Sequence, residues 1–358
     1  MQGTRQAQRH RYAYPRQLTS INSRYHEDLF TAVHRKEHEM KSVHKQHSSL
    51  SDPVQMAMGY VMEIADATRP PPLKLAKALR RVYDEDQETQ NQQDSTTSAT
   101  DTSRLGIKSV GMRKGSFIVD IKRKSLSRPG ETFVSFDDAG VVAEAMVQLG
   151  ADVVFINVDY HAYGGDLSEL RSAIKTVRKV SKTAAVVMKD IVVDEIQLGL
   201  AKDAGADGIL LMASVLGPAL ANFLDLATSI GLETIVECHT RNEVQAALDC
   251  LAQNILVTNF DRVQQKYYPD QAYKLAGMFP GSGGPIICLA GGGLEKPEDM
   301  RRMLAMGYDG VVVGKACMGN TRVSQFIKTV KEQTFLPTEL SQWGLEDVEF
   351  DHDGNLIQ

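Results

Sequence analysis

The chain contains 358 residues and carries a formal net charge of −5, with 42% hydrophobic and 24% charged residues. These values are ordinary for a soluble globular protein of one large or two modest domains, and they exclude a strong overall attraction to nucleic acid. No apolar run reaches the roughly 18 residues of a membrane span. The four cysteines show neither CxxC spacing nor a dense framework. We therefore expect a soluble intracellular protein with reduced thiols and no metal site.

Residues 1–27 form a basic segment in which five arginines precede the first acidic residue, Glu27. This charge bias is typical of an organelle transit segment, for instance a plastid one, and equally of a disordered basic tail. Both interpretations stay open. Three amphipathic stretches follow, at 28–47, 53–67 and 73–83, and they predict an N-terminal helical extension over residues 28–83.

The next segment, residues 84–104, reads DEDQETQNQQDSTTSATDTSR and has almost no apolar side chains. It cannot bury enough apolar surface to offset its ordering entropy, so we predict a flexible polar linker. At the other end of the chain, residues 333–358 form an acidic C-terminal tail.

Between these segments, residues 105–332 alternate short apolar runs with longer amphipathic segments. The eight runs are SFIVDIK (116–122), DVVFINV (152–158), AAVVMK (184–189), GILLM (208–212), ETIVEC (233–238), NILVTN (254–259), PIICLA (285–290) and DGVVVG (309–314). Continuous apolar strands separated by helices predict a parallel sheet that is covered on its outside. Eight units favour an α/β fold of the closed (β/α)8 TIM-barrel kind. An open doubly wound sheet is the alternative, but no GxGxxG follows the first strand.

In such barrels the loops at the C-terminal strand ends converge on one mouth, where function is found. Polar residues end five of the predicted strands: Asp120 with Lys122, Asp159, Lys189 with Asp190, Glu237 and Asn259. Any one of them could be a turn former. The set is more informative, because two lysines and a glutamate at one mouth suit acid–base chemistry.

Glycines follow the last two strands, in AGGGLEKPED (290–299) and at Gly314, which precedes Lys315. Loops at these positions commonly bind a phosphate through backbone N–H groups, which a Cβ would obstruct. With the basic stretch that leads to Ser125, the glycines predict a site for a sugar phosphate.

The motifs resemble those of the indole-3-glycerol phosphate synthase family. DIKRKSLS resembles the EVKRxSPS signature, VVMKDIVVDEIQ resembles KDFIxxxxQ, HAYGGDLSEL looks like an FxGS-type loop, and GLETIVECHT is similar to LVEVH. VHRKEHEMKSV is similar to the family's leading helix, which caps the barrel mouth. The resemblance covers residues 28–330 in order.

The resemblance implies a lyase of tryptophan biosynthesis that needs no cofactor. Its reaction is the ring closure and decarboxylation of 1-(2-carboxyphenylamino)-1-deoxyribulose 5-phosphate. By position, Lys189 would be the general acid, Lys122 would hold the substrate carboxylate, and Glu237 would serve the dehydration. The implied substrate-binding residues are Asp120, Ser125, Asp159, Asn259 and Arg262, and the implied phosphate-binding residues are Ser125, Gly292, Gly293, Gly314 and Lys315.

The chain also departs from the family pattern. Asp120 replaces a glutamate, and Leu126 replaces the proline of the SPS loop. The N-x-R-D of strand six becomes NFDR, so Asp261 stands at the arginine position and Arg262 follows it. The ESG of strand seven becomes Gly291-Gly292-Gly293, which removes a carboxylate from the aryl half of the site.

These departures leave two alternatives open: a non-catalytic barrel that acts as a structural or regulatory subunit, and a barrel enzyme acting on another sugar phosphate. The expected partner is a small sugar-phosphate substrate. Neither nucleic acid nor a membrane is expected as a partner, whereas the N- and C-terminal extensions offer surfaces for a protein.

Overall fold

The computed structural model describes residues 28–47, 52–65, 73–80, 82–83, 113–125, 128–132, 134–279, 285–318 and 322–331. The expected basic segment 1–27, the polar linker 84–104, the acidic tail 333–358 and Leu126 lie outside these ranges. Among the helices that the structure describes, none is long and apolar enough to cross a membrane.

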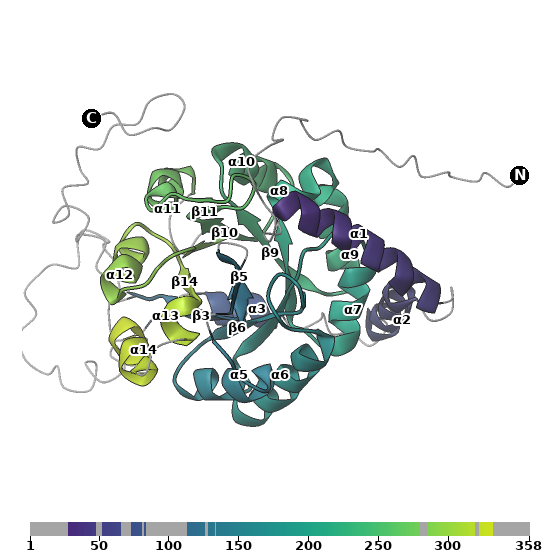
Figure 1. Cartoon of the computed structure of the whole chain (residues 1–358), viewed down its shortest axis with the longest axis horizontal. Helices are drawn as coiled ribbons and strands as arrows, with labels where there is room; N and C mark the ends of the chain where they lie inside the picture. The colour runs from purple at the N-terminus through teal and green to yellow at the C-terminus, as the bar shows by residue number, and fades with distance from the viewer. Residues whose placement is uncertain are drawn as a thin grey trace, which may run out of the picture.

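Eight parallel strands close into a barrel with the order β10-β13-β14-β3-β6-β7-β8-β9 (Figure 1). This confirms the predicted (β/α)8 architecture and excludes the open sheet. The strands are β3 (Ser116–Ile121), β6 (Val153–Asn157), β7 (Ala185–Lys189), β8 (Gly208–Met212), β9 (Glu233–Cys238), β10 (Asn254–Thr258), β13 (Ile287–Gly291) and β14 (Gly310–Val313).

Helices surround the barrel and cover the outer face of the strands (Figure 1). They are α5 (Ala139–Gln148), α6 (Leu167–Val180), α7 (Ile196–Ala204), α8 (Ala213–Leu216), α9 (Leu220–Ser229), α10 (Arg241–Asp249), α11 (Gln271–Leu275), α12 (Pro297–Ala305), α13 (Lys315–Met318) and α14 (Val323–Lys331). Side chains cap the N-termini of several of these helices. The Asp166 side chain accepts the N–H groups of Ser168 and Glu169 at the start of α6, and Thr240 caps α10 in the same way.

Alternate residues of each strand belong to two different apolar layers. In β3, Phe117 and Val119 join the layer between strands and helices, whereas Ile118 belongs to the barrel interior. In β6, Val154 faces outward and Phe155 inward in the same way. This two-residue alternation fixes which side chains at the C-terminal strand ends face the mouth.

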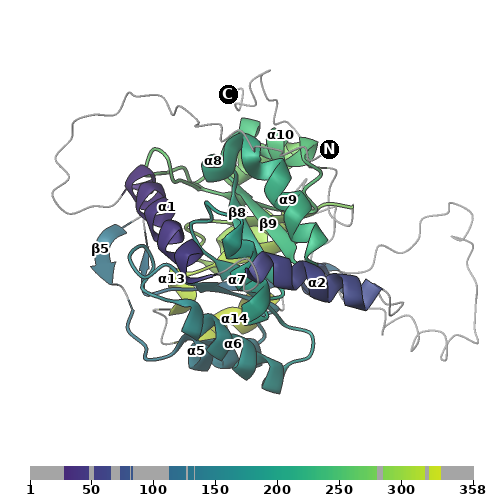
Figure 2. The same cartoon turned by 90° about the vertical axis from the view of Figure 1, so that its right-hand side faces the viewer.

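The N-terminal helices contact the barrel at three different places, and the first two of these helices can be followed in Figure 2. In α1 (Leu29–Gln46), Leu29 and Ala32 join the interior cluster, and the polar face reaches the ends of β6 and β7 through ion pairs described below. The next helix, α2 (Pro53–Ala65), packs on α7 at Gly199, where a Cβ would lie 2.5 Å from the backbone nitrogen of Val54.

The third N-terminal helix, α3 (Lys74–Leu79), closes the other end of the barrel. The carboxylate of Glu233, the first residue of β9, accepts the N–H groups of Leu75 and Ala76 at 2.7 and 2.8 Å. Leu75 and Leu79 are fully buried in the interior cluster. The side chains of α3 therefore fill the barrel at the N-terminal ends of the strands, and the open space lies at the mouth.

Three short two-stranded sheets lie outside the barrel. β1 (Val82–Tyr83) pairs with β2 (Arg113–Lys114), β4 (Lys124–Ser125) pairs with β5 (Arg128–Thr132), and β11 (Phe260–Asp261) pairs with β12 (Lys266–Tyr267). Two 3₁₀ turns, η2 (Gly217–Ala219) and η3 (Ala276–Met278), complete the described elements. Two of the hairpins, β4–β5 and β11–β12, follow strands β3 and β10 at the mouth.

Candidate active site

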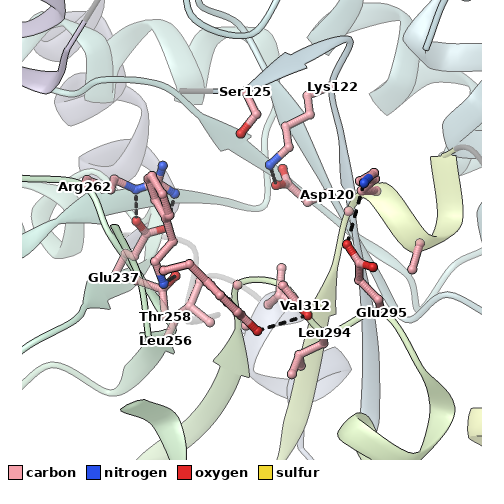
Figure 3. A pocket seen from close by; sticks show the side chains of 18 of the residues that line it. Asp120, Lys122, Ser125, Glu237, Leu256, Thr258, Arg262, Leu294, Glu295 and Val312 are labelled. Carbon is pink, nitrogen blue, oxygen red and sulfur yellow. Dashed lines mark hydrogen bonds and ion pairs between the residues drawn. The ribbon is translucent and has the colours of Figure 1, made fainter. Parts of the chain in front are cut away.

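A cavity of about 620 Å³ opens at the C-terminal ends of the strands (Figure 3). Most of the residues predicted for the site line it: Asp120, Lys122, Ser125, Lys189, Glu237, Arg262, Gly292, Gly293, Gly314 and Lys315. Asp120, Lys189 and Glu237 occupy the inward positions of β3, β7 and β9, in phase with the interior cluster. The strand period thus gathers them from distant parts of the sequence.

Asp120 is the centre of a hydrogen-bonded group in the floor of the cavity. Lys122 donates to its Oδ2, as does Lys189 Nζ at 3.0 Å, while Asn157 Nδ2 donates to Oδ1 at 2.7 Å. Burial opposes the charged form of Asp120, but the ammonium groups of Lys122 and Lys189 outweigh it and hold the pKa well below its ordinary value. Asp120 is therefore a fixed anion that holds both lysines.

Lys189 is almost fully buried. Burial lowers the pKa of its ammonium to about 8, while Asp120 raises it and the positive charges of Lys122 and Arg262 lower it further. A group with a pKa near the working pH can both give and take a proton, which is the property of a general acid or base.

Glu237 and Arg262 form a second buried pair on the other side of the cavity (Figure 3). Arg262 donates to one carboxylate oxygen through Nε and to the other through Nη2, the latter at 3.0 Å. Burial would raise the pKa of Glu237, but the charge and hydrogen bonds of Arg262 outweigh it, so the pKa is lowered. Glu237 is therefore held ionised and oriented by two bonds.

The reversed order of Asp261 and Arg262 has a local cause in the β11–β12 hairpin. The Oδ1 atom of Asp261 accepts the N–H groups of Val263 and Gln264 at 2.8 and 2.9 Å, so this side chain stabilises the turn. Its other oxygen lies 3.7 Å from Nε2 of His239. With Asp261 engaged in the turn, it is the next residue, Arg262, that reaches the cavity.

The predicted phosphate-binding residues line the wall formed by the loops after β3, β13 and β14. Gly292 has a φ of +84°, and a Cβ there would lie 2.7 Å from Oγ1 of Thr258 and 2.8 Å from the nitrogen of Asn259, so only glycine fits. The Tyr267 hydroxyl donates to the Gly293 carbonyl at 3.3 Å. Lys315 Nζ lies 3.7 Å from a carboxylate oxygen of Glu295 at the rim.

Two predicted substrate-binding residues do not line the cavity. Asp159 is fully buried and is bound by α1: Arg35 donates to both of its oxygens at 3.0 Å, and Lys36 Nζ lies 2.7 Å from Oδ2. Asn259 accepts the N–H of Ala272 at 2.8 Å and is also buried. In this structure both side chains support the loops around the site.

The cations after β3 divide as the strand alternation predicts. Lys122 faces the cavity, whereas Arg123 points outward, donates to both carboxylate oxygens of Glu169 in α6, and lies 3.9 Å from the ring centre of Phe136. The described part of the chain contains no group of three or more His, Cys, Asp or Glu side chains that could hold a metal ion.

Sequence reasoning missed several residues of the site. Asn157 ends β6 in phase with Phe155, so the two-residue alternation could have identified it as a partner of Asp120. The cavity residues Phe260, Gln265 and Tyr267 come from the β11–β12 hairpin, which carries no pattern that distinguishes it from an ordinary loop.

Comparisons with known proteins agree with this geometry. A family model described as indole-3-glycerol phosphate synthase matches residues 73–330. The proteins named indole-3-glycerol phosphate synthase from Thermoanaerobacter pseudethanolicus and Chloroherpeton thalassium are 29% and 30% identical to the chain. These alignments cover 63% and 58% of the chain, and 85% and 77% of the relatives.

A multifunctional tryptophan biosynthesis protein of Schizosaccharomyces pombe is also similar, at 28% identity over 57% of the chain and 26% of that protein. The family model spans well over half of the chain and includes every strand of the barrel and every residue that lines the cavity. The chain therefore belongs to the indole-3-glycerol phosphate synthase family.

Proposed function

We propose that the chain is an active lyase of the indole-3-glycerol phosphate synthase type. Its substrate is 1-(2-carboxyphenylamino)-1-deoxyribulose 5-phosphate, and its products are indole-3-glycerol phosphate, carbon dioxide and water. The observation that carries the proposal is the group of two lysines on one buried carboxylate, with Glu237 in the same cavity. A fixed anion and two nearby cations can stabilise oxyanions and move protons without a cofactor.

In this proposal Lys189 is the general acid of the ring closure. The aryl ring carbon attacks the ketone carbon, and the proton of the Lys189 ammonium passes to the ketone oxygen as the carbon–carbon bond forms. Lys122 holds the ring carboxylate, which leaves as carbon dioxide and restores the electrons of the ring. The lowered pKa of Lys189, about 8, supports proton donation near neutrality.

Glu237 serves the dehydration half of the reaction. The hydroxyl takes a proton from the Lys122 ammonium and leaves as water, and Glu237 takes a proton from the ring system as the indole forms. Glu237 is ionised and oriented by Arg262, so we assign it the role of base, with Arg262 as a positioning residue for its carboxylate. The substrate phosphate binds at the opposite wall, with Ser125, Gly292, Gly293, Gly314 and Lys315 as its ligands.

Turnover of the authentic substrate tests this proposal. Purified protein is mixed with the carboxyphenylamino deoxyribulose phosphate, and indole fluorescence is followed. Lys189→Met should lower kcat by about 10²–10⁴-fold, because a positioned acid is lost. Lys175→Met is the matched control, since Lys175 is exposed on α6 far from the cavity, and it should leave kcat unchanged. A folded wild-type protein without turnover would contradict the proposal.

A second candidate is a barrel of the same family that binds a sugar phosphate without converting it. It is favoured by Gly291, which offers no carboxylate to the aryl half, and by Glu237, whose charge is neutralised by Arg262. Titration calorimetry with the substrate separates the two candidates, because binding without product formation supports only the second one.

A further inference from the structure

Asn157 is the last residue of β6, the strand that lies between β3 and β7 in the barrel. Asp120 belongs to β3 and Lys189 to β7, so this ion pair joins two strands that do not pair with each other. Asn157 stands opposite Lys189 in the β6–β7 register, is buried, and has the inward phase of Phe155. The side chain at position 157 therefore lies where Asp120 and Lys189 meet.

The side-chain amide of Asn157 is fixed by two hydrogen bonds from its nitrogen. Nδ2 donates to Oδ1 of Asp120 at 2.7 Å and to the carbonyl of Ile121 at 2.9 Å. Both partners are acceptors, so the reversed amide would bring oxygen against oxygen. The amide oxygen of Asn157 is buried and has no hydrogen-bond partner among the described residues, which is destabilising. An apolar side chain would avoid this unpaired oxygen, so the value of the amide lies in the groups that Nδ2 binds.

The two oxygens of Asp120 are divided between the amide and the lysines. Asn157 binds Oδ1, whereas Lys122 and Lys189 both donate to Oδ2, as Figure 3 shows for Lys122. A carboxylate with both oxygens free can offer each lysine an oxygen of its own. With Oδ1 occupied, both ammonium groups lie at the same oxygen. Asp120 also stands where the family pattern has glutamate, so its carboxylate is one methylene closer to the strand, where the side chain from β6 reaches it.

We propose that Asn157 is a positioning residue for the reaction, because by occupying Oδ1 of Asp120 it brings Lys122 and Lys189 together on Oδ2. The inference rests on the proposed function and adds a residue that does not itself line the cavity. Two like charges at one oxygen repel each other. The repulsion favours proton loss from Lys189, whose side chain is the more buried of the two lysines. Asn157 thus helps to keep the proton of the proposed general acid transferable.

The charges around Lys189 agree with this role. The titratable and charged side chains that face it are Asp120, Lys122, Tyr163, Glu237 and Arg262. Burial lowers the pKa of Lys189 to about 8, Asp120 and Glu237 raise it, and the positive charges of Lys122 and Arg262 lower it further. The effect of Lys122 depends on which oxygen of Asp120 it binds, and Asn157 decides this.

The test compares Asn157→Leu with the matched control Asn254→Leu. Leucine at position 157 has a similar size but no donor, so Asp120 can give each lysine a separate oxygen. Asn254 begins β10, at the opposite end of the barrel from the cavity, and is also buried. Its Nδ2 donates to the carbonyl of Thr234 at 2.8 Å, and its Oδ1 likewise has no partner among the described residues. Both variants alter the stability of the barrel, but only Asn157→Leu should alter the titration of Lys189.

Labelling with acetic anhydride measures the pKa of Lys189 without turnover, because only the neutral amine reacts. Peptide mass spectrometry follows the labelling rate of Lys189 from neutral to alkaline pH. The midpoint should be about 8 in the wild type and in Asn254→Leu. It should lie about one pH unit higher in Asn157→Leu, because separated ammonium groups repel each other less. A midpoint that is unmoved, or that moves to lower pH, would overturn the inference.

Turnover is measured with the same variants. Asn157→Leu should lower kcat by about 10–100-fold, because the proposed acid loses its position, and should change KM little. The alkaline limb of kcat/KM should move to higher pH together with the labelling midpoint. A fall in kcat with an unmoved limb, as a merely structural role would give, overturns the inference and leaves the proposed function intact. If the wild type forms no product, the proposed function fails, and a raised labelling midpoint in Asn157→Leu still supports the placement of the lysines by Asn157.

Asn157→Ser is measured alongside and decides the question if leucine prevents folding. The serine hydroxyl stands one bond nearer to the backbone than Nδ2 of the asparagine, so it should not hold Oδ1 of Asp120. The same upward shift of the labelling midpoint is therefore expected, and a midpoint equal to that of the wild type would overturn the inference.

Discussion

Arg262 holds Glu237 by a two-bonded ion pair that is buried in the wall of the cavity. Arg262→Met leaves the carboxylate buried without its counter-charge, so we expect the free energy of unfolding to fall by about 3–5 kcal/mol. The double variant Glu237→Leu with Arg262→Met should regain most of this loss. Urea denaturation measures both. Arg171→Met is the control, because Arg171 and Asp203 form an exposed pair worth about 0–1 kcal/mol.

The same pair predicts how stability depends on pH in acid. The pKa of Glu237 is lower in the folded chain than its ordinary value of 4.5. The pair therefore stabilises the fold fully above pH 4.5, and this contribution is lost as pH falls through the folded pKa. The wild type should lose stability relative to the double variant as the pH drops below 4.5, because the double variant lacks the group that titrates. A difference that stays constant over that range would contradict the lowered pKa.

Lys189 predicts the alkaline limb of the activity profile. As the proposed general acid with a pKa of about 8, Lys189 loses its proton above that pH, so kcat/KM should fall there. Stability should change in the opposite direction: the unfolded chain keeps this proton up to its ordinary pKa of 10.5, so the free energy of unfolding rises between pH 8 and 10.5. Comparing the wild type with Lys189→Met over this range isolates the stability effect.

Asp120 sets the position of that limb. Its negative charge raises the pKa of Lys189 against the effect of burial. Asp120→Asn should therefore move the alkaline limb of kcat/KM to lower pH, in addition to lowering the rate. Steady-state rates from pH 6 to 9 measure the shift. A lower rate with an unmoved limb would show that Lys189 is not the group that titrates.

Gly291 predicts that the missing carboxylate cannot simply be restored. A Cβ at this position would lie 3.1 Å from Cβ of Val312 and 3.2 Å from Cδ1 of Leu256, so the neighbours have closed the space. Gly291→Glu should cost about 1–3 kcal/mol of stability through overpacking. Gly291→Glu should cost less stability in the Leu256→Ala variant than in the wild type, because the smaller side chain leaves room for the glutamate. Thermal unfolding of the wild type, the two single variants and the double variant measures both costs.

Asp159 predicts a structural effect. Its carboxylate binds Arg35 and Lys36 of α1, and Lys36 Nζ also lies 3.2 Å from Asp190. Lys36→Met should lower the free energy of unfolding by about 3–5 kcal/mol, since it leaves buried carboxylates short of a cation. Lys41→Met, at an exposed position of α1, is the control. Asp159→Asn should lower stability with little change in KM, and a raised KM at normal stability would instead assign it to the substrate.

The barrel and the centre of its site could be predicted from the sequence for one reason: the signals are local. An apolar run predicts each strand. The two-residue alternation then predicts which side chains face the barrel interior, up to the last residue of the strand. Lys189 follows Ala185 and Val187 in this phase, and Glu237 follows Ile235. Parallel pairing then brings these ends to one mouth, so the fold and the residues that line the centre of the cavity could be predicted together.

The rest depended on partners that are far apart in the chain, and no local pattern encodes these. Asp159 follows the end of β6, beside the strand ends that carry the proposed catalytic residues, but Arg35, 124 residues away, binds its carboxylate. In the sequence, Arg262 lies one residue beyond the arginine position of the motif. In the structure, the Asp261 carboxylate accepts a backbone N–H of the β11–β12 hairpin, and Arg262 binds Glu237.

The sequence by itself therefore determined the architecture and the residues offered to the mouth. Only the tertiary structure decided which of these side chains are bound by neighbours, as Asp159 is by Arg35, and which line the cavity. The physical reason is that burial and pairing depend on barrel closure and on helix docking, and both join residues that the sequence keeps apart.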